Sequence, residues 1–307
     1  MELEAVWMDN IKGMAWMTLA MLAFALADMF IKMTVDRLAV GQVILFFGVG
    51  GALVFGVAAR MQGAQLTSPA FLSRPVLARN ASEILGTVCF VIALSKIDLA
   101  TLSAVIMSSP LLVTLGAAVI LGEHVGWRRW LAIGIGMVGV LIILRPGLAG
   151  FEPAALWAVG AAIGLSGRDL ATRPIPREVS TLLLGCWGFV AAASAGAALL
   201  VALGGAVVPD ASETAQLFGA LACALVAYYA ITAAMRVGEI GVVSPFRYTR
   251  LVFAFLIAAV VFGERPDAFT LIGAGIVIAT GLYTFWRETA ARRAVATSPL
   301  PTGRAGR

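Results

Sequence analysis

The sequence predicts an all-α integral membrane protein with ten transmembrane helices, arranged as two inverted five-helix repeats. Two observations lead to this prediction: the composition is too apolar for a soluble domain, and one seven-residue segment occurs twice in almost the same form. Of 307 residues, 61% are hydrophobic and 13% are charged, and the mean hydropathy is +0.96. Soluble domains contain about 45–50% apolar and about 25% charged residues. This chain therefore lacks the polar surface that water requires.

Ten apolar segments of about 19–26 residues are long enough to cross a hydrocarbon core of ~30 Å. Charged residues, prolines or glycines separate each segment from the next. The alternation of apolar and polar residues that a membrane β-barrel requires is absent, so the segments are predicted to be helices. The predicted spans are 12–33, 38–60, 75–95, 99–121, 127–145, 153–171, 179–204, 213–236, 240–263 and 268–286.

The repeated line is AAVILGE at 117–123 and AAVVFGE at 258–264, with five of seven residues identical. The same offset of 141 residues relates positions from the first span to the fifth with positions from the sixth to the tenth. We therefore predict one five-span repeat over 12–145 and a second over 153–287. Matching positions include Trp16 with Trp157, Asp28 with Asp169, Lys32 with Arg173, and Ser103 with Ser244.

An odd number of spans in each repeat fixes the relation between the two repeats. The first repeat begins on one side of the membrane and ends on the other, so the second must run in the opposite sense. Inverted repeats related by an axis in the membrane plane are typical of secondary transporters, whose sites lie between the repeats near the midplane. The polar, basic segment 289–307 is predicted to be a disordered cytoplasmic tail.

The distribution of basic residues predicts the orientation. If the N-terminus is cytoplasmic, the inward segments carry fifteen Lys and Arg residues and the outward segments carry five. Arg247 and Arg250 are not counted, because they fall within a predicted span. Since cytoplasmic loops are enriched in Lys and Arg, both termini are predicted to be cytoplasmic. This bias also explains the net charge of +5 without a nucleic-acid partner.

Two tandem five-span units resemble the drug/metabolite transporter superfamily, and most of all its tandem EamA-like members. In each unit the fourth span ends in Gly-Glu and the fifth is rich in glycine, as LAIGIGMVGVLIILRP and LIGAGIVIATGLYTFW. The resemblance covers residues 12–287. It implies export of amino acids and other metabolites, or transport of nucleotide sugars and vitamins. The third to fifth spans, with a glutamate midway along the third, are similar to those of the bacterial amino-acid exporters, including the aromatic amino-acid branch.

Charges within the predicted spans are the first candidates for a substrate site, because burying a charge in a membrane is costly. Glu83 and Arg250 lie at depths of ~12 Å and ~15 Å from the cytoplasmic side. Paired, they would suit a zwitterion, with Arg250 for a carboxylate and Glu83 for an ammonium group; a structural ion pair is the alternative. Arg79 could instead neutralise Glu83 one turn away, and Arg247 either lines the cavity or snorkels.

Two further pairs lie near the exit ends of matching spans: Asp28 with Lys32, and Asp169 with Arg173. The inverted repeats place one pair at each membrane face. Each pair is either a gate latch or an interfacial i,i+4 ion pair, and we favour the second interpretation. Glu123 and Glu264, which end the repeated lines, are expected to act as caps or surface latches, one at each face.

Prolines and aromatic residues complete the candidates. Pro110 and Pro245 lie within spans, where proline removes a helical hydrogen bond and permits a hinge. Several aromatic residues either line the substrate path or face lipid at the membrane interface. These aromatic residues are Trp16, Trp157, Tyr228, Tyr229 and Tyr248.

Metal-dependent and enzymatic functions are disfavoured because the chain has few residues of the types that they require. His124 is the single histidine, so we expect no His-based metal site, no Ser-His-Asp triad and no cofactor. A membrane-embedded enzyme is the alternative outside transport, but no interfacial catalytic cluster can be assembled. We predict a bacterial inner-membrane secondary transporter that acts as a monomer by alternating access, with Glu83 as proton carrier if transport is proton-coupled. Amino-acid export is the leading activity, and nucleotide-like, vitamin or drug-like substrates are the alternatives.

Overall fold

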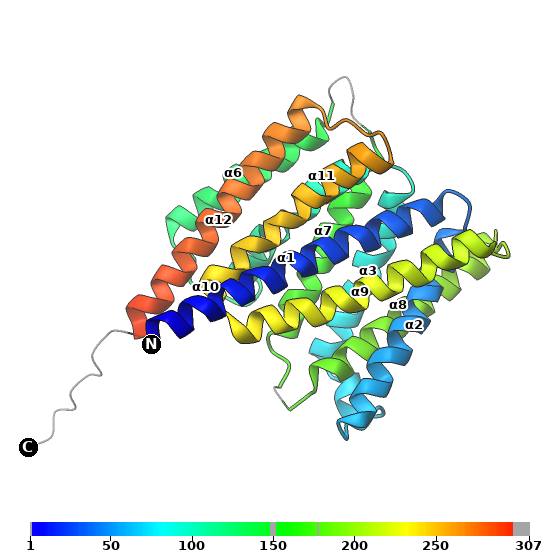
Figure 1. The fold of residues 1–307 in the computed structure, drawn as a ribbon, viewed down its shortest axis with the longest axis horizontal. Helices are drawn as coiled ribbons and strands as arrows, with labels where there is room; N and C mark the ends of the chain where they lie inside the picture. The colour runs from blue at the N-terminus through cyan, green and yellow to red at the C-terminus, as the bar shows by residue number, and fades with distance from the viewer. Residues whose placement is uncertain (1, 148–151, 177, 297–307) are drawn as a thin grey trace, which may run out of the picture.

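The computed structural model describes residues 2–147, 152–176 and 178–296, and this part of the chain contains helices and no strand (Figure 1). The first repeat holds α1 (Glu2–Val35), α2 (Val40–Met61), η1 (Pro69–Leu72), α3 (Arg74–Leu94), α4 (Leu99–Ile106), α5 (Ser109–Val119) and α6 (Trp127–Leu144). The second holds α7 (Ala155–Thr172), α8 (Thr181–Leu203), α9 (Ala211–Val237), α10 (Ile240–Val243), η2 (Ser244–Tyr248), α11 (Thr249–Val261) and α12 (Ala268–Ala296).

Helix contacts follow the predicted two-fold relation between the repeats. Helix α1 packs along α9, and its counterpart α7 packs along α3, the counterpart of α9. Helices α2 and α8 correspond to one another and pack together, as do α6 and α12 (Figure 1). Each repeat thus completes the other rather than folding as a separate bundle, and the predicted ten-helix membrane fold is confirmed.

The bundle has two ends, which we name by the chain termini. The terminal face holds the start of α1 and the end of α12, which lie together in Figure 1. It also holds the ends of α2, α5, α7 and α9. The opposite face holds the ends of α1, α3, α6, α8 and α11. Because successive helices alternate in direction, the matching ends of the two repeats lie on different faces.

The fourth and ninth spans are each broken in two, at matching places. In the first repeat α4 ends at Ile106 and α5 begins at Ser109. In the second, the 3-10 segment η2 separates α10 from α11, which begins at Thr249. Pro110 lies in the first turn of α5 and Pro245 in the first turn of η2, where the missing N–H of proline costs no helical hydrogen bond. A hinge role for these prolines stays a prediction.

The seam between α2 and α8 depends on glycine. A Cβ at Gly48 would lie 2.4 Å from the backbone nitrogen of Ala193, and a Cβ at Gly196 would lie 2.5 Å from that of Leu45. The two backbones therefore touch directly, as in the small-residue contacts that hold membrane helices together. A larger side chain at either glycine would force the seam apart.

Nine helical segments in the described part of the chain are long and apolar enough to cross a membrane. The tenth predicted span, 153–171, corresponds to α7, which does not meet that standard of apolarity. Helix α7 carries Arg168 and Asp169 within its 18 residues. Because it packs along α3 and α5 inside the bundle, it does not need an apolar surface all round.

The last helix extends beyond its predicted end. We expected disorder from residue 289 onward, but α12 continues to Ala296. The segment RETAARRAVA is rich in alanine and arginine, which are strong helix formers, and it continues an established helix without nucleating a new one. Residues 297–307 lie outside the described part of the chain.

Candidate functional site

A group of polar side chains from four elements meets in the half of the bundle nearer the terminal face. We call this group the charge cluster: Arg79 and Glu83 of α3, Arg168 and Asp169 of α7, Tyr228 of α9, and Arg247 of η2. The close packing of α3 on α7 brings the first four together. Gly86 and Gly164 let these two helices approach, since a Cβ at Gly164 would lie 2.2 Å from the nitrogen of Gly86.

Glu83 lies at the centre of the cluster. Its carboxylate is 3.5 Å from the guanidinium of Arg168 and 3.9 Å from that of Arg79. Arg168 also bonds to Asp169 at 2.9 Å, and Arg79 donates to the Leu184 carbonyl at 2.9 Å. The predicted i,i+4 contact between Arg79 and Glu83 is therefore present, but Arg168 joins it.

Tyr228 and Arg247 complete the cluster from the second repeat. The phenol of Tyr228 interacts electrostatically with Arg79, Glu83, Arg168 and Asp169, and its ring packs edge-on against Phe55 at 4.8 Å. Arg247 interacts electrostatically with Asp169 and Arg168. The site thus draws on both repeats.

Part of the charge cluster is exposed at the surface of the helix bundle. The Arg168 and Asp169 side chains are 31% and 49% exposed, and Arg247 is exposed as well. Three arginines against two carboxylates leave one net positive charge. Such a surface offers guanidinium donors to a carboxylate or phosphate and carboxylate oxygens to an ammonium group.

The predicted pairing of Glu83 with Arg250 is wrong. Arg250 bonds to the buried Asp28 of α1 at 2.7 Å, and its guanidinium also lies 5.2 Å from the Phe24 ring. Depth alone suggested the pair, but α11 packs on α1 whereas α3 packs on α7. Arg250 is therefore paired with Asp28 and not with Glu83.

The two predicted i,i+4 pairs are also replaced by pairs between the repeats. Lys32 lies 3.0 Å from Glu264, and Arg173 lies 2.6 Å from Glu123. Lys32 and Arg173 are 141 residues apart, and so are Glu123 and Glu264. The two ion pairs are therefore two-fold counterparts. We call Lys32–Glu264 the opposite-face latch and Arg173–Glu123 the terminal-face latch.

The repeated line of sequence builds the carboxylate half of each latch. Gly122 and Gly263 adopt φ values of +68° and +66°, in the left-handed region that glycine enters without strain. The next N–H then turns back, from Glu123 to the Ala117 carbonyl at 3.0 Å and from Glu264 to the Ala258 carbonyl at 2.9 Å. Orphan carbonyls at the helix end are thereby satisfied, and the glutamates serve as both caps and latches.

The remaining aromatic candidates are dispersed. Trp157 lies near the start of α7 and is exposed, 11 residues or ~17 Å along the helix from Arg168. Trp16 packs edge-on against the exposed Tyr229 at 5.9 Å. The buried hydroxyl of Tyr248 has no hydrogen-bond partner among the described residues, and it lies against Gly281 of α12. Of the aromatic candidates, Tyr228 interacts with four charged members of the cluster and Tyr248 with Arg247.

Sequence reasoning missed Arg168, which it had placed among the basic residues of a loop. The adjacent pair Arg168-Asp169 was the available signal, because it lowers the apolarity of this span below that of the other nine. Within the described residues, no group of three or more His, Cys, Asp or Glu is placed to hold a metal ion.

The profile of the EamA-like transporter family matches residues 11–145 and again residues 152–286. The chain belongs to the EamA-like transporter family. A protein of known crystal structure aligns with a TM-score of 0.58 at 21% identity, over 88% of this chain and 97% of that one, and so shares the fold. The resemblance to tandem EamA-like members is therefore confirmed.

Curated relatives carry the names of bacterial transporters with different substrates. A riboflavin transporter of Rhizobium johnstonii is 29% identical over 90% of this chain and 91% of its own length. An S-adenosylmethionine uptake transporter of Rickettsia prowazekii is 25% identical, over 91% and 94%. The pseudopaline exporter CntI of Pseudomonas aeruginosa is 23% identical, over 87% and 93%. This EamA-like protein is thus a multi-pass membrane transporter for a small molecule.

Proposed function

We propose that this EamA-like protein is a secondary transporter for amino acids or amino-acid-derived metabolites, acting as a monomeric exporter in the bacterial inner membrane, and not an enzyme. The charge cluster is the observation that carries the proposal. Arg168 and Arg247 are accessible cations for a substrate carboxylate, and Asp169 is an accessible anion for an ammonium group. The names of relatives give partial support, because S-adenosylmethionine carries both groups on one carbon.

Alternating access between the two faces follows from the latches. With the terminal face assigned to the cytoplasm by the positive-inside rule, the opposite-face latch closes the outer gate and the terminal-face latch the inner gate. Both latches are formed here, but the outer latch is buried whereas the inner latch is largely exposed. On this proposal the inner gate is the weaker of the two, and the cluster would receive its cargo from the cytoplasm once the terminal-face latch opens.

A flat vitamin is the second candidate, and two observations favour it. Named riboflavin transporters are among the relatives, and the partly buried ring of Tyr228 lies beside the charges. Such a cargo would stack on the Tyr228 ring and use the arginines as hydrogen-bond donors to its carbonyl oxygens. The two candidates differ in their need for Asp169, since riboflavin has no ammonium group.

Transport into and out of proteoliposomes tests the proposal. Vesicles are supplied in turn with a mixture of radiolabelled amino acids, with S-adenosylmethionine and with riboflavin. Wild type is compared with Asp169→Asn, Arg168→Gln and, as a matched control, Arg265→Gln on an outer loop. Amino-acid or S-adenosylmethionine flux lost in the two cluster variants and kept in the control is the expected result.

The other outcomes are equally informative. Riboflavin flux that survives Asp169→Asn would favour the vitamin and contradict an amino-acid substrate. Amino-acid flux that is unaffected by either cluster variant would remove the charge cluster from the site. A substrate bound by the wild type and converted to product, without crossing the membrane, would contradict transport itself.

A further inference from the structure

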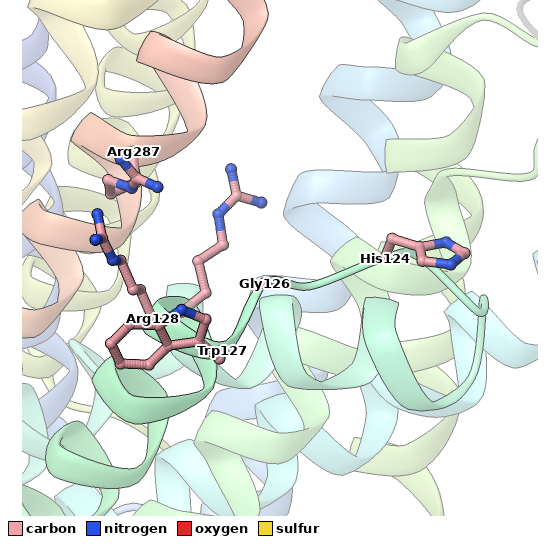
Figure 2. Close-up of a pocket in the computed structure, with 6 residues that line it drawn as sticks. His124, Gly126, Trp127, Arg128 and Arg287 are labelled. Atoms are coloured by element: carbon pink, nitrogen blue, oxygen red, sulfur yellow. The ribbon is translucent and has the colours of Figure 1, made fainter.

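A separate hollow lies on the terminal face, away from the charge cluster. It has a volume of about 420 Å³ and lies between the start of α6 and α12. Figure 2 shows Trp127 and Arg128 on the first turn of α6, Arg287 approaching from α12, and His124 standing off along the preceding loop. The lining residues are His124, Gly126, Trp127, Arg128, Arg129 and Arg287.

The charges of this hollow are uncompensated. No carboxylate whose side chain is described forms an ion pair with Arg128, Arg129 or Arg287. In contrast, Arg145 and Arg173 at other loop ends are each paired with an acidic residue. Three guanidinium groups around one concavity favour an anion with several oxygens, and arginine matches phosphate geometry in particular.

The start of helix α6 adds to this preference. Gly126 occupies the N-cap position, and no side chain caps the helix there. The first N–H groups of an uncapped helix carry partial positive charge and favour anions. The guanidinium of Arg128 lies 5.4 Å from the Trp127 ring, a stacked position that holds the charge at the mouth of the hollow.

The surroundings place the hollow at the edge of the bilayer. Trp127, Trp130 and Trp286 are exposed near it, and exposed tryptophans of membrane helices lie at the level of the lipid headgroups. Below them α6 presents the exposed residues Leu131, Ile135 and Val138. Together with Trp127 they follow helical spacing, so one apolar stripe runs from the hollow into the hydrocarbon region.

We propose that this hollow binds the phosphodiester headgroup of an anionic phospholipid, with the acyl chains along the α6 stripe. Basic pockets between transmembrane helices are suited to anionic headgroups. Inorganic phosphate has the same charge chemistry, but it would leave the apolar stripe unused. The bound lipid would bridge α6 and α12, the pair that closes each repeat, and so link them at the terminal face.

Lipid binding can be measured without any transport assay. The purified full-length protein in neutral detergent is titrated with dioleoyl phosphatidylglycerol or dioleoyl phosphatidylcholine, and bound lipid is counted by native mass spectrometry. The variant Arg128→Gln/Arg129→Gln/Arg287→Gln removes the three charges. The matched control Arg60→Gln/Arg74→Gln/Arg236→Gln removes three exposed and unpaired arginines from the same face. Helix content and monodisperse elution establish that each variant is folded.

We expect phosphatidylglycerol affinity to fall at least about tenfold in the first variant and to change little in the control, with phosphatidylcholine weak throughout. Equal losses in both variants, or no loss in the first, would overturn the proposal. Displacement of the lipid by millimolar inorganic phosphate would assign the hollow to free phosphate instead. If the triple variant does not fold, Arg287→Gln alone is tested, and unchanged affinity in that variant overturns the proposal.

Discussion

The two latches have the same sequence pattern and nearly the same local backbone, yet their environments differ. Lys32 and Glu264 are 15% and 8% exposed, whereas Arg173 and Glu123 are 41% and 52% exposed. Lys32 also donates to the Ile97 carbonyl at 2.7 Å, and Glu264 accepts from the Ala100 N–H at 3.3 Å. No such additional bonds are made by the terminal-face latch within the described residues.

This difference in exposure predicts a difference in the energetic cost of breaking each latch. Breaking a buried ion pair by removing one partner costs about 3–5 kcal/mol, since a charge is left without compensation. An exposed pair contributes about 0.2–1 kcal/mol. Removal of one partner is therefore expected to cost several times more at the opposite-face latch than at the terminal-face latch. In the opposite facing state of the proposed transport cycle, the terminal-face latch would be the buried one and the opposite-face latch the exposed one.

The largest predicted effect is that of Glu264→Gln. Lys32 would remain buried without its counter-charge, so we expect the opposite face to open at a cost to the closed state of about 3–5 kcal/mol. Ala100→Cys, introduced after replacement of Cys89, Cys186 and Cys223 by serine, reports opening through its reaction with an impermeant maleimide. Faster labelling is expected with Glu264→Gln but not with the counterpart Glu123→Gln. Equal labelling rates in the two would contradict the difference between the latches.

Substitution of the glycine at the end of each repeated segment should destabilise the protein equally, in contrast to substitution of the two latch glutamates. Gly122→Ala and Gly263→Ala place a Cβ in the left-handed region, at a cost of about 1–2 kcal/mol each. No atom lies within 4 Å of either added Cβ, so the cost is conformational and should be equal at the two sites. Thermal unfolding in detergent measures it. A clearly larger loss at one glycine would show that the two caps are not equivalent.

A smaller effect is expected for Glu123→Gln on its own. The terminal-face latch is exposed, so its loss should destabilise the protein by about 0.2–1 kcal/mol, and added salt should reduce that difference further. Unfolding at low and high ionic strength tests both statements. A loss comparable to that of Glu264→Gln would mean that the terminal-face latch is as strong as its counterpart.

The smallest effect concerns the group formed by Arg37, Asp210 and Glu213 on the opposite face. Asp210 caps α9: it accepts from the Glu213 N–H at 2.8 Å, and Arg37 lies 3.1 Å from it. The bond from the Glu213 backbone, with help from Ser212 and Arg37 and despite partial desolvation, lowers the pKa of Asp210 below its ordinary 3.8. The stabilisation is therefore complete above pH 3.8 and is lost as pH falls through the lower folded value.

Hydrogen exchange of the first turn of α9 measures this pH dependence. Protection should fall in acid for the wild type and should not depend on pH in this range for Asp210→Asn. Because Glu213 also contacts Arg37, Glu213→Gln is the control that separates the cap from the neighbouring charge. Acid-insensitive protection in the wild type would contradict the assigned role of Asp210.

The fold was predictable because two signals reinforced one another. Segment length and apolarity identify spans one at a time, and the offset of 141 residues then fixes their relation. Even the latches followed that offset, since Lys32 matches Arg173 and Glu123 matches Glu264. The ion-pair partners of Lys32 and Arg173 could not be predicted. Each basic residue has an acidic residue four positions earlier on its own helix, and the sequence does not say whether its side chain contacts that residue or one on another helix.

The site was predicted in its residue types and only partly in its pairs. Glu83, Arg79, Arg247 and Tyr228 were among the candidates and meet in the charge cluster. Arg250 was assigned to Glu83 because the two have similar depth, but neighbours are decided by helix packing, which places Arg250 beside Asp28. Trp157 was a candidate for the aromatic lining, but it lies near the start of α7, ~17 Å along the helix from Arg168.

The direct contact of α2 with α8 has a mechanical consequence. These two helices are exchanged by the same symmetry that exchanges the two latches, so in the proposed transport cycle their shared seam would be the same in both facing states. Gly48 and Gly196 would then belong to the pivot of the motion and not to either gate. A bulkier residue there should slow exchange in both directions without changing which side the protein prefers to face.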